Sequence, residues 1–326
     1  MFKNLLFVNN ASVYGGQERY AKDIIDLFLA EGCDIYFLGG PVEVGRNCRV
    51  FSDIKFDVCI LNGNSALYSL VKNQFNANFK VYVQHSNIND GQQAFWRRWI
   101  RKVLLKLLLL RVNVVVRVCN NALPEFYAPG KVITIYNGVD LPDYYPKVSL
   151  NNNVNLLMVG AVNKNKNQKL AIELLVIQPN AYLTIVGDGS DINSLKRYAE
   201  KLGVSERIRW TGFVTEPDKY YREADFLLML SYFEAFPYSV LEAMSYGTPV
   251  IAVPVGGVPE IIKTGVNGWL VKDYSVTNLA DKLNQVWSDP LQYSKVASNA
   301  RKTIATSFTK QAMFNMLLTE IKKRKM

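Results

Sequence analysis

The sequence has 326 residues, of which 49% are hydrophobic and 20% are charged, and its formal net charge at pH 7 is +10. This length allows two ordinary domains, and the composition excludes a disordered or collagen-like chain. The surplus of positive charge predicts attraction to an acidic partner: a nucleic acid, an anionic membrane surface or a phosphate-bearing substrate.

Apolar runs of strand length alternate with helical patterns along the chain. The runs form two series, 5–8, 35–38, 58–61, 81–84, 114–118 and 133–136, then 156–160, 182–186, 208–211, 226–230, 250–253 and 269–271. Helical patterns separate most of them, for example at 18–30, 168–177 and 191–202. This alternation predicts parallel sheets covered by helices on both faces. Two series of about six strands exceed one comfortable sheet, so we expect an α/β fold with two doubly wound domains.

We expect no secretory signal, membrane-spanning helix or disulfide in this sequence. The first residues, "MFKNLLFVNN", become polar too early for a secretory signal and predict a strand instead. The longest apolar region, 103–119, is interrupted by charged and polar side chains, which argues against a membrane-spanning helix. The cysteines have no paired spacing, so we expect buried thiols in a reducing compartment rather than disulfides or a metal site. They are Cys33, Cys48, Cys59 and Cys119.

The stretch 137–153, "NGVDLPDYYPKVSLNNN", interrupts the pattern with prolines and a run of asparagines. Such clusters mark loops and linkers. We therefore expect one domain over residues 1–140 and a second over 141–307. Ligands of open α/β sheets bind beyond the carboxyl ends of the strands, so two such domains that face each other would enclose a cleft.

Residues Phe95 to Arg111, "FWRRWIRKVLLKLLLLR", combine apolar and basic side chains at helical spacing. Tryptophans beside arginines and lysines are typical of a helix that lies in an anionic membrane interface. The alternative is an ordinary helix that packs on the sheet and has a solvated basic face. We expect this helix to bind an anionic membrane surface, and the basic end from Lys322 to Met326 adds to the attraction.

The stretch from Ser231 to Ala252, "SYFEAFPYSVLEAMSYGTPVIA", predicts a helix followed by a buried strand. Pro237 suits a first helical turn and Gly247 suits a helix end, so the helix is expected to run between them. The N–H groups of its first turn, at Tyr238 and Ser239, form a positive helix end that suits a phosphate.

Two glutamates lie around the start of this helix, Glu234 just before it and Glu242 inside it. Glu242 can accept hydrogen bonds from two neighbouring ribose hydroxyls, and Glu234 can accept them from a sugar. A nucleotide sugar would need the phosphate, ribose and sugar contacts together. The alternative is a helix that a glutamate caps and that carries a surface carboxylate, and the spacing alone leaves both interpretations open.

Seven motifs in chain order resemble retaining GT-B glycosyltransferases of the GT4 family, and the resemblance covers nearly the whole chain. The stretch from Phe233 to Ile262 resembles the E-x7-E signature of that family. The other motifs are "YGGQERYAKDI" (Tyr14 to Ile24), "ITIYNGVD" (Ile133 to Asp140), "LLMVGAVNKNKNQ" (Leu156 to Gln168), "IVGDGS", "WTGFV" and "GVNGWLV". The resemblance implies a GT-B architecture: two Rossmann-like domains, the first for the acceptor and the second for the nucleotide sugar. It also implies that the final helix, within 308–326, crosses back onto the first domain.

The resemblance also implies roles for individual residues. Glu234 corresponds to the glutamate near the donor sugar, and Lys166 corresponds to the lysine that neutralises the departing phosphate. His85 falls where the family has a histidine beside the transferred sugar, so these three residues are expected to be catalytic. Glu242 corresponds to the glutamate that holds the ribose, and Val214 to the wall that receives the base. The expected donor-binding residues are Gly15, Gly16, Val214, Ala235, Phe236, Tyr238, Ser239 and Glu242.

His85 is the only histidine of the chain. Without the resemblance, a structural role is the simpler interpretation of a lone histidine after a strand. Its place at the carboxyl end of a strand favours a role in binding. Gly15 and Gly16 match the glycine-rich loop that approaches the diphosphate closely, which a Cβ would obstruct.

Two positions depart from the family pattern. Ala161 stands where the family often has an arginine, so the phosphate contact would depend on Lys166 with help from Lys164. Pro237 stands where glycine is frequent, which removes one N–H donor but suits a helix start. An Asp-x-Asp pair, which holds a metal ion in many other glycosyltransferases, does not occur in the sequence. We therefore expect a metal-independent mechanism without a cofactor, in which cations and helix N-termini stabilise the leaving diphosphate.

The expected function is retaining transfer of a sugar from a nucleotide-sugar donor, UDP- or GDP-linked, to a lipid-linked glycan acceptor in surface polysaccharide or lipopolysaccharide biosynthesis. We expect the protein in the cytoplasm, peripheral on the inner face of the cytoplasmic membrane. The alternatives are a nucleotide-sugar epimerase, a phosphorylase-like enzyme of the same fold, and a sugar-nucleotide-binding subunit without catalysis. Only the net charge favours nucleic-acid binding, and no motif of that class occurs, so no nucleic-acid partner is expected.

Overall fold

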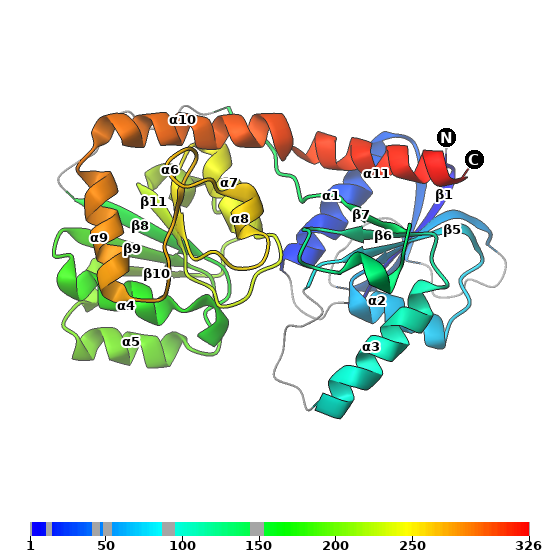
Figure 1. The fold of residues 1–326 in the computed structure, drawn as a ribbon, viewed down its shortest axis with the longest axis horizontal. Coiled ribbons are helices and arrows are strands. Elements are labelled where there is room, and N and C mark those ends of the chain that lie inside the picture. Colours follow the sequence, from blue (N-terminus) through cyan, green and yellow to red (C-terminus); the bar gives the residue numbers. More distant parts are fainter. Residues whose placement is uncertain are drawn as a thin grey trace. The chain divides into compact units, whose positions relative to one another are not determined.

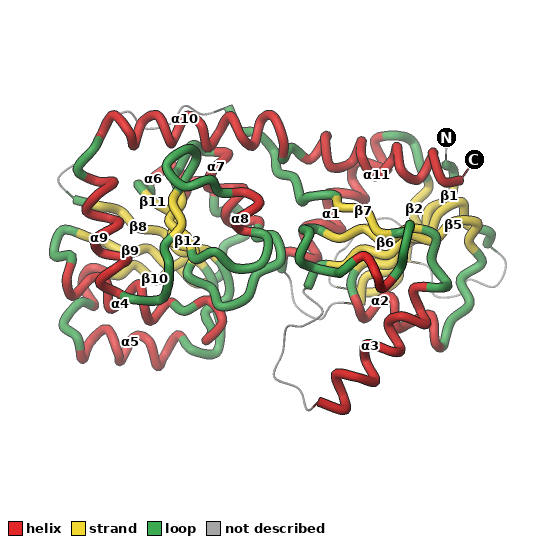
Figure 2. Tube along the Cα trace, viewed as in Figure 1, coloured by secondary structure: helices red, strands yellow, loops and turns green. Residues whose placement is uncertain are grey.

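The computed structural model describes residues 2–10, 15–40, 46–47, 54–86, 95–143 and 153–325. It divides into two compact units, which we call the first unit and the second unit. The first unit comprises Met1–Asn137 and Lys310–Met326, and the second unit comprises Gly138–Thr309. Each unit is a sheet with helices packed against it (Figure 1, Figure 2).

The first unit is built on a parallel sheet with the strand order β3-β2-β1-β4-β5-β6-β7. Residues 5–8 of its central strand β1 are all fully buried. A parallel strand covered on both faces reads as a continuous apolar run, which is why this segment lacks alternation. The strands are β1 (Asn4–Asn10), β2 (Asp34–Gly40), β3 (Arg46–Asn47), β4 (Phe56–Asn62), β5 (Ala77–Gln84), β6 (Val114–Arg117) and β7 (Val132–Thr134).

The helices of the first unit are α1 (Gly16–Ala30), α2 (Asn64–Tyr68), η1 (Ser69–Val71), α3 (Phe95–Leu109), η2 (Glu125–Tyr127) and α11 (Lys310–Lys325). The final helix α11 packs on α1 although the two are far apart in sequence (Figure 1). The Phe314 and Phe28 rings meet edge to face with their centroids 4.9 Å apart. Lys310 Nζ lies 2.8 Å from Oδ1 of the buried Asp23. An aromatic contact and an ion pair therefore hold the last helix on the first.

The second unit is built on a parallel sheet with the strand order β10-β9-β8-β11-β12-β13. In its core, the Phe226 ring meets Trp269 and Tyr293 edge to face, with centroid distances of 6.0 and 5.4 Å. The strands are β8 (Val154–Val159), β9 (Ala181–Val186), β10 (Ile208–Gly212), β11 (Phe226–Met229), β12 (Val250–Ala252) and β13 (Trp269–Leu270). The helices are η3 (Lys164–Lys166), α4 (Gln168–Ile177), α5 (Ile192–Lys201), η4 (Ser205–Arg207), α6 (Asp218–Glu223), α7 (Tyr238–Ser245), α8 (Val258–Ile261), α9 (Val276–Trp287) and α10 (Pro290–Ser307).

Each sheet has one point at which the strand order reverses. In the first unit it lies between β1 and β4, and in the second unit it lies between β8 and β11. The loops that leave neighbouring strands at such a point diverge to opposite faces of the sheet and leave a crevice. The carboxyl ends of these four strands are therefore the places where a ligand site is expected in this fold.

The expected fold class is confirmed: both units are α/β with parallel, doubly wound sheets. Every strand of the two predicted series is present, and the helix predicted at 168–177 has those bounds. Strand β3 was not predicted, because two residues are too few to show a pattern. Cys33, Cys59 and Cys119 are buried free thiols, as expected, and Cys48 lies outside the described residues.

None of the helices in the part of the chain that the structure describes has the length and apolar character needed to cross a bilayer.

Candidate active site

Lys166 and Glu234 form an ion pair at the reversal point of the second sheet. Lys166 Nζ lies 2.5 Å from Glu234 Oε1, and the two side chains are 23% and 13% exposed. Lys166 belongs to the loop after β8, and Glu234 belongs to the loop after β11. An ammonium group has three N–H donors, so a lysine that binds one carboxylate oxygen retains donors for an anionic ligand. The structure thus brings together the two residues of this unit that were predicted to be catalytic.

The loop that carries Lys166 is a single 3-10 turn between β8 and α4. The side chain of Asn163 accepts a hydrogen bond from the Lys166 N–H at 3.2 Å, which caps the turn. Asn167 then adopts a left-handed conformation with φ of 53°, and α4 begins at Gln168. Asparagine tolerates this conformation better than most residues, so the asparagines of "NKNKNQ" give the loop its shape.

The side chain and backbone of Asn165 hold the loop that carries Glu234. The Tyr232 N–H donates to the Asn165 carbonyl at 2.8 Å, and the Phe233 N–H donates to Asn165 Oδ1 at 3.0 Å. Asn165 Nδ2 donates in turn to the Phe233 carbonyl, also at 3.0 Å. The residue next to Lys166 therefore fixes the residue next to Glu234. The sequence analysis missed Asn165, because a single asparagine in a loop is no specific signal.

Gly256, in the loop after β12, approaches the backbone of the loop that carries Glu234. Its φ is 55°, and a Cβ on this residue would lie 1.5 Å from the Glu234 carbonyl oxygen. The following Gly257 N–H donates to the Ala235 carbonyl at 2.7 Å. Only glycine fits here without displacing the backbone of Glu234. The paired glycines after β12 were quoted within the E-x7-E stretch, but no role was predicted for them.

Helix α7 begins at Tyr238, four residues after Glu234. Its N-terminal flank is Pro237, and Tyr238 and Ser239 form its half-buried first turn. The helix ends before Gly247, whose φ of 70° gives the left-handed turn that glycine favours. Phe236 is 4% exposed and its ring packs on Phe308, so what it can offer a ligand is its backbone. The predicted helix is confirmed within one residue at each end.

Tyr221 positions the carboxylate of Glu242. The Tyr221 hydroxyl donates to Glu242 Oε2 at 2.6 Å, and its fully buried ring stacks on Tyr246 with the centroids 5.9 Å apart. Burial raises the pKa of Tyr246, with a hydrogen bond to Asp218 as a further cause. Glu242 itself is only partly buried. A carboxylate that is anchored at one oxygen and reached by solvent can receive hydroxyl groups of a ligand.

The remaining predicted residues of the second unit lie in loops at the same edge of the sheet. Val214 is half-buried in the loop after β10, and Ala235 is half-buried just before α7. Ala161 and Lys164 are exposed in the loop after β8. Lys164 therefore comes from the same short loop as Lys166, at the position where the sequence suggested additional positive charge.

The first unit holds the other predicted residues, which follow the carboxyl ends of β1 and β5 in its own sheet. His85 follows β5, and its Nε2 lies 2.6 Å from Oδ1 of Asn62 at the end of β4. The Tyr20 ring meets the His85 ring edge to face at 4.9 Å. Gly15 precedes α1 with an extended φ of −163°, and Gly16 is the first helical residue. No glycine-specific conformation is required at Gly15, so its contribution is the missing side chain.

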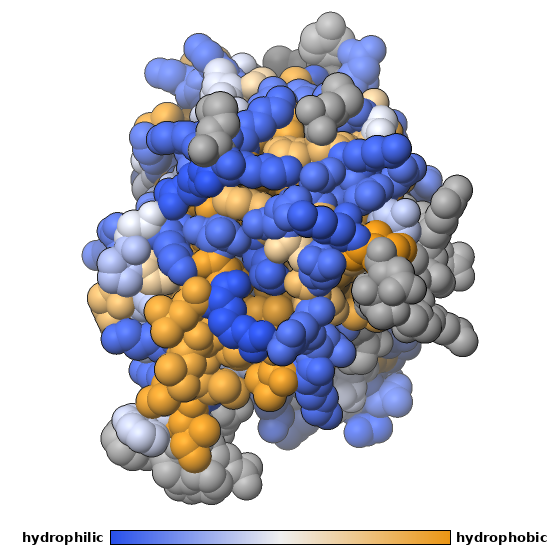
Figure 3. Space-filling model, turned by 90° about the vertical axis from the view of Figure 1, so that its right-hand side faces the viewer, coloured by the Kyte–Doolittle hydropathy of each residue, from blue (hydrophilic) through white to orange (hydrophobic). Residues whose placement is uncertain are grey.

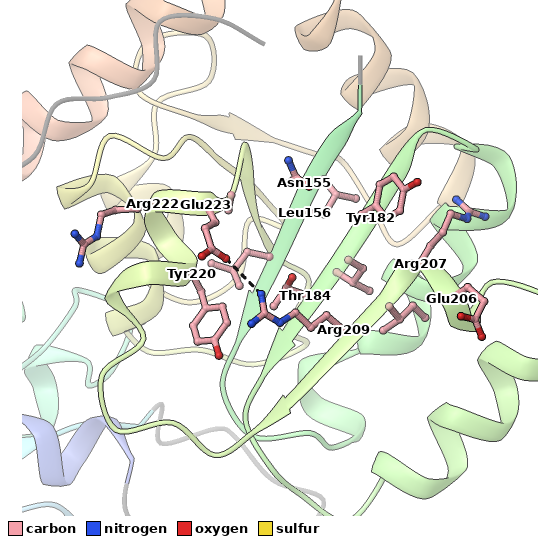
Figure 4. Close-up of a pocket in the computed structure, with 14 residues that line it drawn as sticks. Asn155, Leu156, Tyr182, Thr184, Glu206, Arg207, Arg209, Tyr220, Arg222 and Glu223 are labelled. Atoms are coloured by element: carbon pink, nitrogen blue, oxygen red, sulfur yellow. Dashed lines mark hydrogen bonds and ion pairs between the residues drawn. The ribbon is translucent and has the colours of Figure 1, made fainter. Parts of the chain in front are cut away.

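A cavity of about 660 Å³ lies at the opposite edge of the second sheet. Its lining includes Asn155 near the start of β8 and Arg209 near the start of β10. Figure 4 shows Arg209 paired with Glu223, and its guanidinium lies 5.2 Å from the centroid of the Tyr220 ring. Arg207 donates to backbone carbonyls, among them that of Leu175 at 2.7 Å. Arg207 and Arg209 are thus already paired, and the cavity lies at the amino ends of the strands.

No group of three or more His, Cys, Asp or Glu side chains is placed to hold a metal ion within the ranges that the structure describes.

The second unit matches a model of a known protein family. A family model described as Glycosyl transferases group 1 matches residues 146–303. Lipopolysaccharide 1,6-galactosyltransferase from Salmonella typhimurium is 36% identical over 116 residues, which is 34% of this chain and 32% of that protein. N-acetyl-alpha-D-glucosaminyl L-malate synthase from Bacillus anthracis is 26% identical, over 61% of this chain and 56% of that protein. The chain thus spans about a third to a little over half of the length of these curated relatives.

Solved structures share the fold over nearly the whole chain. The Anabaena HepE protein, crystallised in complex with UDP and glucose, superposes with a TM-score of 0.82 at 21% sequence identity. The match covers 99% of this chain and 100% of that chain. At this level of identity the likeness demonstrates the fold, and the residues of the site have to be argued from their own geometry.

Acidification is expected to destabilise the first unit through His85. Burial lowers the pKa of His85 from 6.5 to about 3, so between these values the unfolded chain binds a proton that the folded chain does not. Stability therefore falls as the pH decreases from about 6.5, by at most about 1.4 kcal/mol per pH unit because a single proton is bound, and by less than this limit because His85 is only half-buried. Urea unfolding at several pH values from 7 to 5, compared with His85→Gln, measures this. Parallel pH dependences of the two proteins would contradict the expectation.

Proposed function

We propose that this chain, whose second unit matches the family model described as Glycosyl transferases group 1, transfers a sugar from a nucleotide-sugar donor to a glycan acceptor. The donor binds at the carboxyl ends of β8 and β11. The ion pair of Lys166 and Glu234, placed beside the start of α7, is the observation that carries this proposal. It combines a cation for a phosphate, a carboxylate for sugar hydroxyls and a helix N-terminus at one place.

Each part of the donor has a counterpart at this edge. The diphosphate lies at Lys166 and at the N–H groups of the first turn of α7, where the helix dipole favours negative charge. The ribose hydroxyls donate to Glu242, which Tyr221 holds in place. The sugar lies at Glu234, and the base lies against the segment around Val214. The Anabaena HepE protein was crystallised with UDP, with UDP and glucose, and with UDP-glucose, which supports a uridine nucleotide as the first donor to test.

We propose that the reaction retains the anomeric configuration and needs no metal ion. The bond between the anomeric carbon and the leaving diphosphate oxygen breaks, and the acceptor oxygen bonds to the same face of the sugar. The acceptor proton passes to an oxygen of the donor phosphate. Lys166 and the N–H groups of α7 stabilise the charge that grows on the diphosphate, which is the largest electrostatic requirement of this step.

The acceptor is proposed to be a lipid-linked glycan, and helix α3 is proposed to hold the protein at the inner face of the cytoplasmic membrane. On α3 and just after it, Trp99, Val103, Leu107 and Leu110 are 61%, 39%, 56% and 71% exposed. These positions follow helical spacing on one side, while Leu105, Leu108 and Leu109 are buried on the other. Figure 3 shows apolar side chains gathered in the lower part of the face in view, where α3 lies in Figure 1. The side chains of residues 95–98 lie outside the described ones.

The charge on α3 supports a membrane rather than a protein as the partner of these four exposed residues, which form an apolar stripe. Lys106 is exposed and Arg101 and Lys102 are partly exposed on the same helix. An exposed apolar stripe beside cations matches the interface of a bilayer that contains anionic lipids. Salmonella galactosyltransferase and other relatives act on lipopolysaccharide according to their names, which supports an acceptor of this class.

Substitutions at the site are expected to separate binding from transfer. Glu242→Ala removes the ribose contact and should weaken donor binding about 10- to 100-fold. Glu234→Gln and Lys166→Ala should slow transfer about 10²- to 10³-fold, because they act on the reacting sugar and the leaving phosphate. Calorimetry with UDP-, GDP-, ADP- and dTDP-sugars identifies the donor, and radiolabelled donor then measures transfer and hydrolysis.

The matched control is Glu206→Ala, an exposed glutamate at the opposite edge of the same sheet, which should change neither quantity. Full transfer activity in Glu234→Gln or Lys166→Ala would remove the assignment of the reacting centre. Epimerised donor or a dependence on free phosphate would instead favour the alternative enzymes of this fold.

Transfer is expected to continue in the presence of EDTA, because Lys166 and the α7 N-terminus replace a metal ion in the stabilisation of the diphosphate. Turnover is measured with and without the chelator and again after addition of Mg²⁺ or Mn²⁺. A loss of activity in EDTA that a divalent cation restores would show that the diphosphate departs on a metal ion.

Removal of charge from α3 is expected to release the protein from anionic vesicles. The double substitution Lys102→Gln with Lys106→Gln removes about 2 kcal/mol of surface attraction, so partitioning should fall roughly thirtyfold. Co-sedimentation with vesicles that contain phosphatidylglycerol measures this, with uncharged vesicles for comparison. Lys55→Gln with Lys72→Gln makes the same charge change at exposed sites elsewhere in the first unit and should have little effect. Equal losses in the two double variants would exclude α3 as the docking surface.

A further inference from the structure

A buried polar cluster lies at the carboxyl ends of β1 and β4 in the first unit. It consists of Asn9, Gln17, Asn62 and His85, and both asparagines are fully buried. Buried amides destabilise a fold unless their donors and acceptors are paired. Amides that pair with one another in this way hold each other in fixed orientations. Asn62 is the last residue of β4 and belongs to none of the motifs that the sequence analysis identified.

The backbone of Gln17 determines the orientation of the Asn62 amide. Asn62 Nδ2 donates to the Gln17 carbonyl at 3.0 Å and to Asn9 Oδ1 at 2.9 Å. A backbone carbonyl can only accept, so the Asn62 atom that faces it is the nitrogen. The Gln17 side chain is oriented in the same way, because its Nε2 donates to the Asn62 carbonyl at 2.9 Å. The Asn62 atom that lies 2.6 Å from His85 Nε2 is therefore the oxygen.

This orientation determines which nitrogen of His85 carries the proton. An amide oxygen only accepts, so His85 Nε2 is protonated, and in a neutral ring Nδ1 then keeps its lone pair. Burial lowers the pKa of His85, which keeps the ring neutral at pH 7. Asn62 is the one hydrogen-bond partner of this ring among the residues described, and the edge contact with Tyr20 packs it from the side.

We propose that Asn62 is a positioning residue that holds His85 in the tautomer with a proton on Nε2, so that Nδ1 stays available as a hydrogen-bond acceptor for a hydroxyl group of a sugar substrate. The second half of this statement rests on the proposed function, and the first half does not. A histidine held in this way discriminates between sugars by requiring a hydroxyl donor at one position, because an unpaired acceptor would otherwise remain in the site. Asn62 itself touches no substrate and acts through the ring.

The tautomer can be measured directly because the chain has a single histidine. The test uses tag-free protein labelled with ¹⁵N-histidine and a two-bond ¹H–¹⁵N correlation spectrum at pH 7. The expected spectrum has a pyrrole-type Nε2 and a pyridine-type Nδ1. A protonated Nδ1 with an unprotonated Nε2 would overturn the proposal without any variant or ligand.

Variants test whether Asn62 causes the tautomer. Asn62→Leu should give a mixture of tautomers and reduce kcat/KM for the donor about tenfold. Asn62→Asp keeps the size and the acceptor but adds a charge, so His85 should take up a second proton and both nitrogens should become pyrrole-type. The matched control is Asn64→Leu, whose side chain contacts Tyr82 and Ser86 at the end of the next strand but not His85.

The results separate this proposal from the proposed function. The kinetic assay uses the nucleotide sugar that binds most tightly in the calorimetric screen, and the tautomer is read from the spectrum of the protein without a ligand. An unchanged tautomer and unchanged kcat/KM in Asn62→Leu would refute the positioning role. If no donor binds the wild type, the proposed function fails, whereas the tautomer and its dependence on Asn62 are still decided.

Discussion

The pairing of Lys166 with Glu234 depends on two loops that leave neighbouring strands at the point where the strand order reverses. Asn165 binds the backbone of the Glu234 loop from one side, and Gly256 lets a third loop approach it from the other. The backbone that carries the cation and the carboxylate is therefore already fixed. This lowers the entropy that the loops lose when a charged ligand binds.

The two units use the same topological position for different chemistry. The reversal point of the second sheet carries an ion pair that solvent reaches in part, which suits the phosphate and sugar of a donor. The reversal point of the first sheet carries a neutral, buried network that ends on His85. The unprotonated nitrogen of a neutral imidazole can bind a group that donates a hydrogen bond, such as a hydroxyl, and cannot bind a group that only accepts one. A charged pair, by contrast, mainly recognises charge.

Helix α3 gives the first unit a surface that the interior does not require. Leu105, Leu108 and Leu109 already bury one side of the helix, and the exposed stripe on the other side adds nothing to the core. Exposed apolar patches of this kind mark interaction sites in folded proteins. The stripe lies on an element that contributes no residue to the candidate site, so the proposed association with a membrane and the proposed chemistry at the site can be tested separately.

The sequence by itself determined the class of fold, nearly every strand, the helix that follows Glu234 and the residues of the ion pair, because apolar periodicity, helix-end residues and a resemblance along the chain are local signals. The roles of Asn165, Gly256, Tyr221 and Asn62 were decided only by the tertiary structure. Each of them acts on a residue that is distant in sequence, as when Asn62 orients His85 across two strands, and a single asparagine, glycine or tyrosine carries no mark of its partner. Contacts between loops of different strands depend on strand order and backbone geometry, and these exist only once the sheet has formed.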